Sequence, residues 1–387
     1  MSYLRRDIEP LVKKLAKQFP VIALIGPRQS GKTSLVRHLF KDKAYVNLES
    51  PDVLQAIKLD PRSFLQQHPD GAVIDEVQHF PELLSYLQTS VDEKQIPGFF
   101  ILTGSHQLML HEAITQSLAG RVALLTLLPL SIHELSITEE NSVDGCIFNG
   151  FYPRLHQEHI DPALFYQFYF QTYVERDVRM LINLKDLSLF QHFMRLCASR
   201  AAQVMNIQSL GNEIGVSFHT IKHWLSILEA SFILFRLPPY FENFGKRFIK
   251  MPKFYFTDVG LAAYLLGIRN VDQLSRDPLR GHLFENMVVL DFLKTRLNHG
   301  LDSELYFYRD SQQHEIDLIF REGHELVPVE IKASATFHPE FLKNIHYFQK
   351  LTQDRVKKSY VIYSGEKSMQ IQSSRLINYT KIESIKG

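Results

Sequence analysis

The segment that most constrains this chain is an apolar run at residues 21–25, VIALI, followed at once by Gly26-x-x-x-x-Gly31-Lys32-Thr33. This spacing is the P-loop pattern, in which glycines permit a tight turn and backbone N–H groups point at phosphates. Lys32 is expected to reach the β- and γ-phosphates, and Thr33 to hold Mg²⁺. The pattern predicts ATP and Mg²⁺ as cofactors, with these binding residues: Gly26, Pro27, Arg28, Gln29, Ser30, Gly31, Lys32, Thr33 and Ser34.

Two acids end the next strongly apolar strand. Residues 71–76, GAVIDE, read as a buried strand that ends in Asp75 and Glu76. This is the Walker B arrangement, in which the first acid holds Mg²⁺ and the second orients or deprotonates the attacking water. Because strands and helices alternate over residues 1–140, we predict a doubly wound parallel sheet with helices on both faces and the nucleotide at the strands' carboxyl ends.

Two further segments of this first domain carry candidate catalytic groups. A strand at residues 98–105, GFFILTGS, ends in Thr103 and Ser105, which stand where a γ-phosphate sensor is expected. The alternative is that these hydroxyls only cap the end of the strand. Arg121, after SLAG, is a candidate arginine finger that acts on a neighbouring subunit's nucleotide. Its alternative is an ordinary surface charge.

Length and charge limit the remaining interpretations. A chain of 387 residues is too long for one compact core, so several domains are expected. With 43 basic and 42 acidic residues the net charge is +1, so any DNA surface must be a local patch. The two cysteines, Cys146 and Cys197, have no metal-ligand spacing, and no run is apolar enough to span a membrane. These features predict a cytoplasmic protein.

The middle of the chain divides into a helical linker or lid at residues 141–190 and a winged helix-turn-helix at residues 191–270. In the second of these, NIQSLGNEI, a Gly-Val-Ser turn and FHTIKHWLSILEAS read as two helices, with Ser217 as the N-cap of the recognition helix. A β-hairpin with a basic, aromatic loop follows. Predicted nucleic-acid contacts are Lys222, Lys246, Arg247 and Lys250, with Lys253 in the same loop. Since Lys222 is the one lysine of the recognition helix, a purely protein-binding winged helix is the alternative.

Residues 271–387 hold a second chemical constellation. Glu285 lies in a predicted helix, Asp317 in one strand, and Glu330 and Lys332 on the same face of the next strand. Asp317 and Glu330 are predicted to share Mg²⁺, with Lys332 orienting water or balancing charge. This order is similar to the PD-(D/E)xK nuclease core, although Glu315-Ile316-Asp317 lacks the preceding proline. An exposed ion pair, or a degenerate core that binds DNA without cutting it, is the alternative.

Taken in order, GPRQSGKT, VIDEVQHFPELLSYL, ILTGS, SLAGR, YVERDV, the helix-turn-helix and VEIKAS resemble a prokaryotic family. Its members are AAA-type ATPases (AAA_14) joined to a C-terminal domain of unknown function (DUF4143) with a restriction-endonuclease-like end. The resemblance covers residues 15–380 and implies an α/β multidomain fold. It also implies that Glu76, Lys32 and Asp75 act in hydrolysis, and that Glu285, Asp317, Glu330 and Lys332 form a nuclease-like site.

The sequence therefore predicts an ATPase that binds and remodels or processes duplex or branched DNA. Its C-terminal domain is expected to bind DNA, and cleavage is a further possibility left open. A homo-oligomer is expected, with a ring such as a hexamer as one form, because Arg121 needs a partner chain to act. The alternative function is a nucleotide-driven oligomeric switch or scaffold that recognises protein partners and retains a degenerate nuclease fold.

Overall fold

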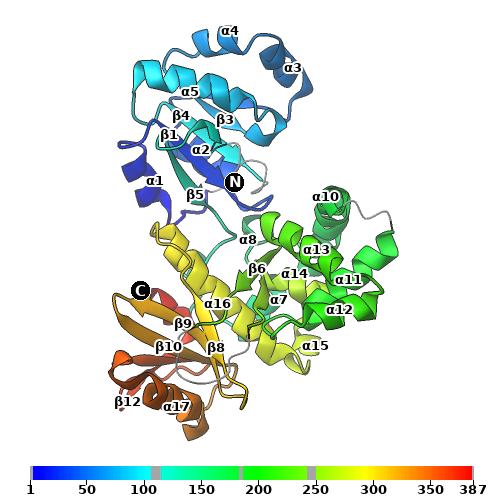
Figure 1. The fold of residues 1–387 in the computed structure, drawn as a ribbon, viewed down its shortest axis with the longest axis vertical. Coiled ribbons are helices and arrows are strands. Elements are labelled where there is room, and N and C mark those ends of the chain that lie inside the picture. The colour runs from blue at the N-terminus through cyan, green and yellow to red at the C-terminus, as the bar shows by residue number, and fades with distance from the viewer. Residues whose placement is uncertain (1–2, 106–113, 115, 183–185, 242–249, 386–387) are drawn as a thin grey trace.

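The computed structural model describes residues 3–105, 114, 116–182, 186–241 and 250–385. The first part of the chain is a parallel-sheet domain, seen at the top of Figure 1. Its helices and strands are α1 (Glu9–Leu15), β1 (Val21–Ile25), α2 (Lys32–Leu39), β2 (Ala44–Asn47), α3 (Pro51–Leu59), α4 (Pro61–Gln66), β3 (Ala72–Asp75), α5 (Leu83–Lys94), β4 (Phe100–Gly104) and β5 (Val122–Thr126).

The sheet of this domain has the order β2-β3-β4-β1-β5, and every pairing in it is parallel. Strand β1 is buried along its whole length because helices cover both faces. Val21, Ala23 and Ile25 face one apolar cluster, whereas Ile22 and Leu24 face another together with residues of α1 and α2. The alternation follows from the two-residue period of a strand. The doubly wound sheet predicted from the sequence is thus confirmed.

The middle of the chain is helical. Its elements are α7 (Val143–Asn149), α8 (Pro153–Glu158), α9 (Pro162–Tyr169), a π-helix (Phe170–Val178), α10 (Arg179–Ile182), α11 (Leu187–Ser199), α12 (Ile207–Ile214), α13 (Phe218–Ala230), β6 (Leu234–Leu237), β7 (Lys253–Phe256), α14 (Val259–Leu265) and α15 (Val271–Ser275). Helices α12 and α13 meet at a turn in which Gly215 has φ 83°, and the Ser217 side chain caps α13 by accepting from the Thr220 N–H. The antiparallel pair β6 and β7 follows.

The last part of the chain contains a long helix and a mixed sheet. Its elements are α16 (Arg280–Asn298), β8 (Tyr306–Arg309), β9 (Glu315–Glu322), β10 (Glu325–Lys332), α17 (Lys343–Thr352), β11 (Ser359–Tyr363), β12 (Met369–Ile371) and β13 (Ser374–Asn378). The sheet order is β12-β13-β11-β10-β9-β8, with β10, β11 and β13 parallel to one another. Helix α17 covers one face of the sheet, and α16 packs on β10 from the other.

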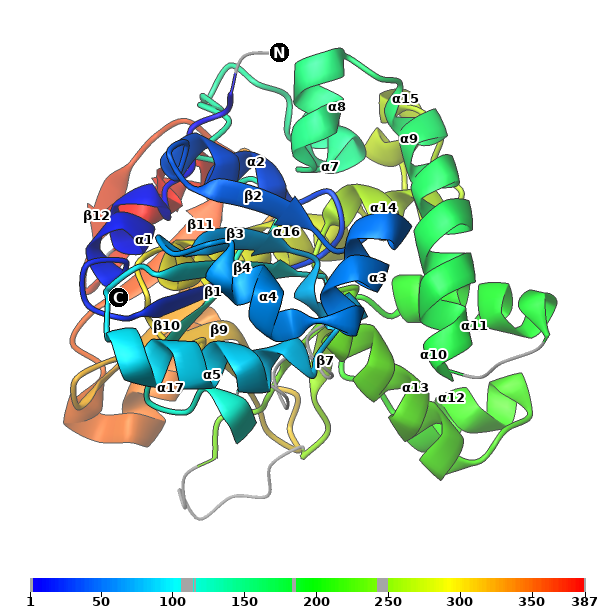
Figure 2. The same cartoon turned by 90° about the horizontal axis from the view of Figure 1, so that it is seen from above.

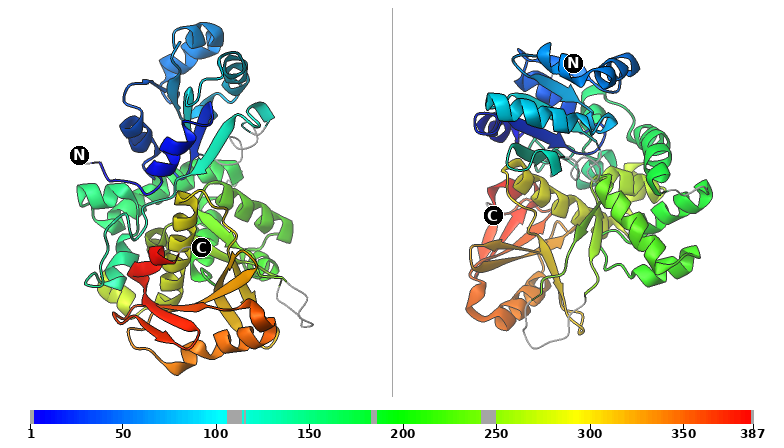
Figure 3. Two further views of the ribbon diagram at one scale, coloured as in Figure 1. Left: turned by 90° about the vertical axis from the view of Figure 1, so that its left-hand side faces the viewer. Right: turned by 45° about the horizontal axis from the view of Figure 1, so that its top comes forward.

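Helix α16 occupies the centre of the molecule. It contacts β5 of the parallel sheet, β7 and α14 of the middle part, and β10 of the C-terminal sheet. Figure 2 shows it beneath the parallel sheet, and Figure 3 shows the two sheets at opposite ends with this helix between them. Most buried apolar residues from Val21 to Ile385 belong to a single connected cluster. The three parts therefore share a core.

Candidate nucleotide site and a second acidic site

The P-loop follows β1 as the sequence predicted. Gly31 has φ 94° and stands at the N-cap of α2, a left-handed conformation that favours glycine. A Cβ added at Gly26 would lie 2.1 Å from the Leu127 carbonyl oxygen, so that position has no room for a side chain. The Ser30 hydroxyl is buried and has no hydrogen-bond partner among the described residues. An unpaired donor inside the loop fits a phosphate oxygen as its partner.

Lys32 lies inside this loop. Its side chain is buried, and Nζ donates to the carbonyls of Gly26 at 2.9 Å and Pro27 at 2.8 Å. Burial lowers the pKa of Lys32 to about 8, against the opposing effect of Glu76 and Asp75. The ammonium thus donates to the loop's own carbonyls. Burial disfavours its positive charge, and the negative charge of a bound polyphosphate would stabilise it.

Asp75 ends β3 beside the P-loop and is held by three side chains. Thr33 Oγ1 donates to Asp75 Oδ2 at 2.9 Å, and the Tyr45 hydroxyl donates to the same oxygen at 2.5 Å. The Thr103 hydroxyl donates to Oδ1. Thr33 and Asp75 therefore present adjacent hard oxygen atoms, which is the donor chemistry that Mg²⁺ prefers.

Glu76 follows Asp75 with φ 56°, a left-handed conformation directly after the strand. Ser105 Oγ donates to Glu76 Oε2 at 3.0 Å, and Gln78 donates to the same oxygen. Burial acts to raise the pKa of Glu76, but Lys32 and these hydrogen bonds outweigh it, so the pKa lies below its usual value. Glu76 is thus a carboxylate at neutral pH and is able to accept a hydrogen bond from water.

Thr103 and Ser105 stand at the end of β4 and contact the two acids. Besides its bond to Asp75, the Thr103 hydroxyl accepts from the Glu76 N–H at 3.2 Å. In this structure both hydroxyls therefore orient Asp75 and Glu76, and their predicted role as γ-phosphate sensors stays a prediction.

Arg6 is a supporting residue of the P-loop that the sequence pattern did not indicate. Its buried guanidinium donates to the Ser30 carbonyl at 2.7 Å and the Leu128 carbonyl at 2.8 Å, and pairs with Glu134 at 2.9 Å. It thereby joins the P-loop to the segment that follows β5. Arg5 and Arg6 are identical in type and adjacent in sequence, so nothing local distinguishes the supporting residue from its exposed neighbour.

Arg121 lies at the start of β5, where its carbonyl accepts from the Val21 N–H at 3.2 Å. Because all strands of the sheet are parallel, Arg121 lies at the end where the strands begin, and the P-loop lies at the opposite end, where they finish. The guanidinium makes two hydrogen bonds to the Asp92 carboxylate, at 2.5 and 2.9 Å. Within the chain Arg121 is therefore paired at a surface remote from Lys32, and its role as an arginine finger stays a prediction about a neighbouring subunit.

The four residues predicted for the second constellation come together, between α16 and the C-terminal sheet. Lys332 Nζ lies 2.7 Å from Glu330 Oε1 and 3.5 Å from Asp317 Oδ2. Asp317 Oδ2 also accepts from the Ile331 N–H at 2.8 Å. Glu285, on α16, is buried nearby and affects the same carboxylates electrostatically. We call this cluster, with Lys253, Tyr255 and Glu315, the second site.

The acids of the second site are largely buried, and burial shifts their pKa values. Burial raises the pKa of Glu285 to about 7 and that of Glu330 to about 8, and the charge of Asp317 adds to both shifts. Glu330 Oε2 is buried without a hydrogen-bond partner among the described residues. This leftover acceptor beside Asp317 fits a cation or a donor group of a ligand.

Lys253 corrects one expectation. The sequence placed it with the basic residues of the hairpin loop, whereas it lies in β7 with its side chain 1 % exposed. Its Nζ is 2.8 Å from Glu285 Oε1 and 2.6 Å from Glu315 Oε1. Tyr255, two residues on, donates to the same Glu285 oxygen at 2.7 Å. The reason is tertiary, because β7 packs on α16 and brings its alternate side chains into the second site.

Of the other predicted nucleic-acid contacts, two are exposed and two lie in a part of the chain that the structure does not describe. Lys222 is exposed on α13, and Lys250 is exposed before β7. Lys246 and Arg247 lie outside the described residues. None of the helices in the described ranges is long and apolar enough to cross a membrane.

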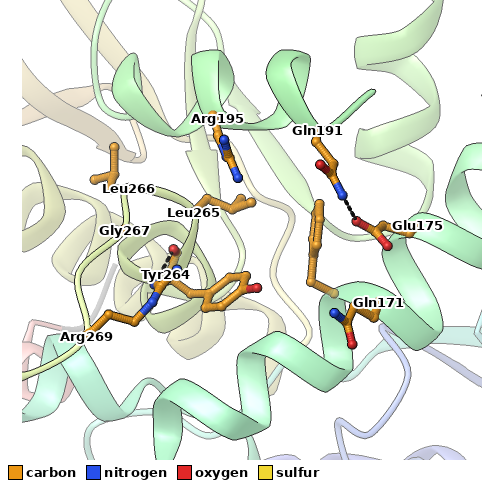
Figure 4. Close-up of a pocket in the computed structure, with 10 residues that line it drawn as sticks. Gln171, Glu175, Gln191, Arg195, Tyr264, Leu265, Leu266, Gly267 and Arg269 are labelled. Atoms are coloured by element: carbon orange, nitrogen blue, oxygen red, sulfur yellow. Dashed lines mark hydrogen bonds between the residues drawn. The ribbon is translucent and has the colours of Figure 1, made fainter. Parts of the chain in front are cut away.

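A cavity of about 260 Å³ lies apart from both sites, in the helical middle (Figure 4). The π-helix, α11 and the end of α14 surround it. Figure 4 shows Gln191 bonded to Glu175, at 2.6 Å, and Arg269 folded against Tyr264. The same π-helix reaches the nucleotide site, where Arg28 lies over the ring of Tyr173 at 5.8 Å from its centroid.

Three families match the chain in succession. An AAA domain (AAA_14) matches residues 18–136, a domain of unknown function (DUF8612) matches residues 140–272, and another (DUF4143) matches residues 280–382. The chain therefore carries an AAA domain followed at its C-terminal end by a DUF4143 domain. With the P-loop and both acids in place, it is an ATPase. The DUF8612 match spans, as one unit, the two middle segments predicted separately.

Related chains add no assigned function. Uncharacterized proteins of Mycobacterium bovis (Mb2031c) and Mycobacterium tuberculosis (Rv2008c) are each 29% identical over 94% of this chain and 80% of their own length. An uncharacterized protein of Haemophilus influenzae is 23% identical over 79% of this chain and 80% of its own. Among solved structures, the Walker-type ATPase paby2304 of Pyrococcus abyssi is 15% identical, with a TM-score of 0.42 over 67% of this chain and 95% of that one.

Proposed function

We propose that this ATPase uses ATP and Mg²⁺ to bind and remodel or process DNA, and that its C-terminal domain is nuclease-like and contacts the DNA. The observation that carries the proposal is helix α16, which contacts the second site and the segment after β5. Lys294 Nζ donates to the Leu130 carbonyl at 2.8 Å, and Glu285 of the same helix lies in the second site. Arg6 joins that segment to the P-loop through the Leu128 and Ser30 carbonyls, so α16 offers a route between the two sites.

The nuclease-like assignment rests on element order and residue placement. The order α16, β8, β9, β10, α17, β11 is a helix, three strands, a helix and a strand. The acid of the helix, the acid of β9 and the Glu-x-Lys of β10 lie in one cluster, which supports the proposed likeness to a PD-(D/E)xK core. Asp317 and Glu330 would hold Mg²⁺, which would activate water and stabilise the phosphate charge. Whether the site cleaves DNA is a separate question, and a DNA-binding role alone satisfies the proposal.

Support for DNA as the partner comes from the middle part. Helices α12 and α13 with the β6–β7 pair have the order of a winged helix-turn-helix, and Lys222 and Lys250 are exposed on it. Lysines at such positions neutralise phosphates and make binding depend on salt.

The test is the ATPase rate of the full chain with no DNA and with linear, forked and four-way DNA at low salt. We expect stimulation by at least one of these DNAs, lost in Lys222→Ala/Lys250→Ala but kept in a matched double variant of exposed lysines, Lys14→Ala/Lys17→Ala. Unstimulated hydrolysis together with no DNA binding overturns the proposal.

The second candidate function is a nucleotide-driven switch that assembles with itself or with protein partners. It is favoured by the net charge of +1 and by the face of α13, where Phe218 is 38% exposed beside His219 and Lys222. Mass measurement with and without ATP distinguishes the two. A switch changes its oligomeric mass on binding ATP in Glu76→Gln, where hydrolysis is blocked, but not in Lys32→Ala, where binding is lost.

A further inference from the structure

Lys253 divides the carboxylates of the second site into two halves. Its Nζ lies between Glu285 and Glu315, at 2.8 and 2.6 Å, whereas Lys332 Nζ lies between Glu330 and Asp317, at 2.7 and 3.5 Å. The two lysines come from different parts of the chain, β7 and β10. Arg309 adds a second cation to the first half, since its Nη1 lies 3.0 Å from Glu315 Oε2. Each half thus has at least one fixed cation.

The half that contains Lys253 is closed. The lysine is 1 % exposed, and Glu285 Oε1 accepts from both Lys253 and Tyr255. Lys253 and Tyr255 are two residues apart on one strand, so they point to the same side and reach the same oxygen. Burial acts to lower the pKa of Lys253, but Glu285, Glu315 and Asp317 outweigh it and raise the pKa, so the ammonium stays charged.

The other half is more open. The Lys332 side chain is 32% exposed, and Glu330 Oε2 is buried without a partner among the described residues. Within the described ranges, Asp7, His133 and Glu383 bring three metal-ligating atoms within 4.8 Å of one another, and no such group of three comes from the second site. The four carboxylates of the second site are thus not gathered around one point, although Lys332 bridges Asp317 and Glu330.

We propose that Lys253 takes the place of one divalent cation in the second site, so that the site binds a single Mg²⁺ or Mn²⁺, at Asp317 and Glu330. Lys253 is then a positioning residue that holds Glu285 and Glu315 together, and Lys253 and Arg309 jointly balance the charge of these two acids. Two-metal phosphoryl-transfer sites place their ions about 3.5–4 Å apart, which requires both carboxylate pairs to be free for metal. The inference rests on the proposed Mg²⁺ site and adds its stoichiometry.

The experiment is Mn²⁺ binding to the full chain without nucleotide, measured by electron paramagnetic resonance as ions bound per chain. Variants are Lys253→Met, Lys253→Arg, Asp317→Asn and, as a matched exposed lysine, Lys343→Met. We expect Asp317→Asn to lose one ion relative to the wild type, and Lys253→Met to gain one. Lys253→Arg and Lys343→Met should bind as many ions as the wild type, since both retain a cation between Glu285 and Glu315.

The gained ion should disappear again in Lys253→Met/Glu285→Gln, because Glu285 is its expected ligand. Should Lys253→Met prove too unstable to titrate, Lys253→Met/Glu315→Gln removes one acid with the lysine, and Mn²⁺ should raise its melting temperature more than that of the wild type. An unchanged ion count in Lys253→Met, or an unchanged melting temperature in the double variant, refutes the role of Lys253. If Asp317→Asn instead binds as many ions as the wild type, the proposed Mg²⁺ site is refuted.

Discussion

The Asp291 side chain of α16 accepts a hydrogen bond from the Ile132 N–H at 2.8 Å, across 159 residues of sequence. Ile132 lies four residues after Leu128, whose carbonyl accepts from the P-loop's supporting residue Arg6. Asp291 lies six residues beyond Glu285 of the second site. Burial raises the pKa of Asp291 to about 6, with Lys294 acting in the opposite direction. The ATPase domain and the DUF4143 domain are therefore joined through a buried hydrogen bond whose acceptor is a titratable carboxylate.

That contact makes a pH prediction. A folded pKa of about 6 lies above the ordinary value of 3.8, so the folded state binds the extra proton between these values and stability falls as pH rises through them. The Asp291→Asn variant does not titrate there. Its free energy of unfolding relative to the wild type should therefore rise by about 2 kcal/mol between pH 4 and pH 7. Urea unfolding at several pH values measures this, and a flat difference contradicts it.

Replacing Glu76 with Gln should separate binding from hydrolysis. The Glu76→Gln variant keeps the size of the side chain but removes the charge that accepts a proton from water, so the ATPase rate should fall about 10²–10⁴-fold. Affinity for a fluorescent ATP analogue should stay within about threefold of the wild type, because the phosphate ligands remain. Glu82→Gln, at an exposed position, is the control and should hydrolyse normally.

The crowding at Gly26 gives a steric prediction. In Gly26→Ala the new methyl group would meet the Leu127 carbonyl at 2.1 Å, so the loop must shift, and ATP binding should be lost. Gly281→Ala is the matched change, since a Cβ at this helical position meets nothing within 4 Å. It should raise the free energy of unfolding by about 0.4–1 kcal/mol. Thermal melts with and without Mg-ATP test both variants, and Gly26→Ala that is stabilised by ATP like the wild type would falsify the steric argument.

Arg6 should matter to stability as well as to ATP binding. Arg6→Met leaves the buried Glu134 carboxylate without its guanidinium partner, although the Asp7 and Ser131 N–H groups still donate to it, and this should cost about 3–5 kcal/mol of the free energy of unfolding. It also frees the Ser30 carbonyl, so ATP affinity should fall. Arg5→Met, exposed and adjacent, is the control and should change stability by less than about 0.5 kcal/mol. Equal effects of the two substitutions in urea unfolding would argue against a supporting role for Arg6.

Arg121 and Asp92 allow the arginine-finger hypothesis to be tested by a pair of variants. Both Arg121→Ala and Asp92→Ala break the same exposed ion pair, which should leave stability nearly unchanged. If a neighbouring subunit uses Arg121, the ATPase rate falls about 10³-fold in Arg121→Ala and stays near the wild-type value in Asp92→Ala. Similar rates in the two variants at concentrations where the protein is oligomeric reject the finger.

The nucleotide site was predictable from the sequence because its chemistry is local. The glycines, Lys32 and Thr33 lie within one turn, and Asp75 ends a strand whose apolar run is plain. The four predicted residues of the second site were also expected to lie together. Strand alternation and the order of the elements are enough to predict that Asp317 and Glu330 are neighbours.

The residues that the sequence did not reveal act across long separations. Lys253 stands in a run of lysines and aromatic residues that also describes an exposed loop, and only the packing of β7 on α16 buries it. Arg6 looks like Arg5 until the segment after β5 folds over it. The π-helix at residues 170–178 was likewise not predicted, because nine residues are too few to distinguish its i→i+5 bonding from an ordinary helical pattern.

The connected apolar core has a practical consequence for anyone dissecting this chain. A fragment ending at residue 140 would carry Leu128 and Ile132 to its surface, since both belong to the cluster that continues through the helices to Ile385. A fragment beginning at residue 271 would likewise strip α16 of its neighbours. Truncated chains are therefore expected to aggregate before their activities can be measured. Point substitutions in the intact chain are the better way to separate ATP hydrolysis from the role of the C-terminal domain.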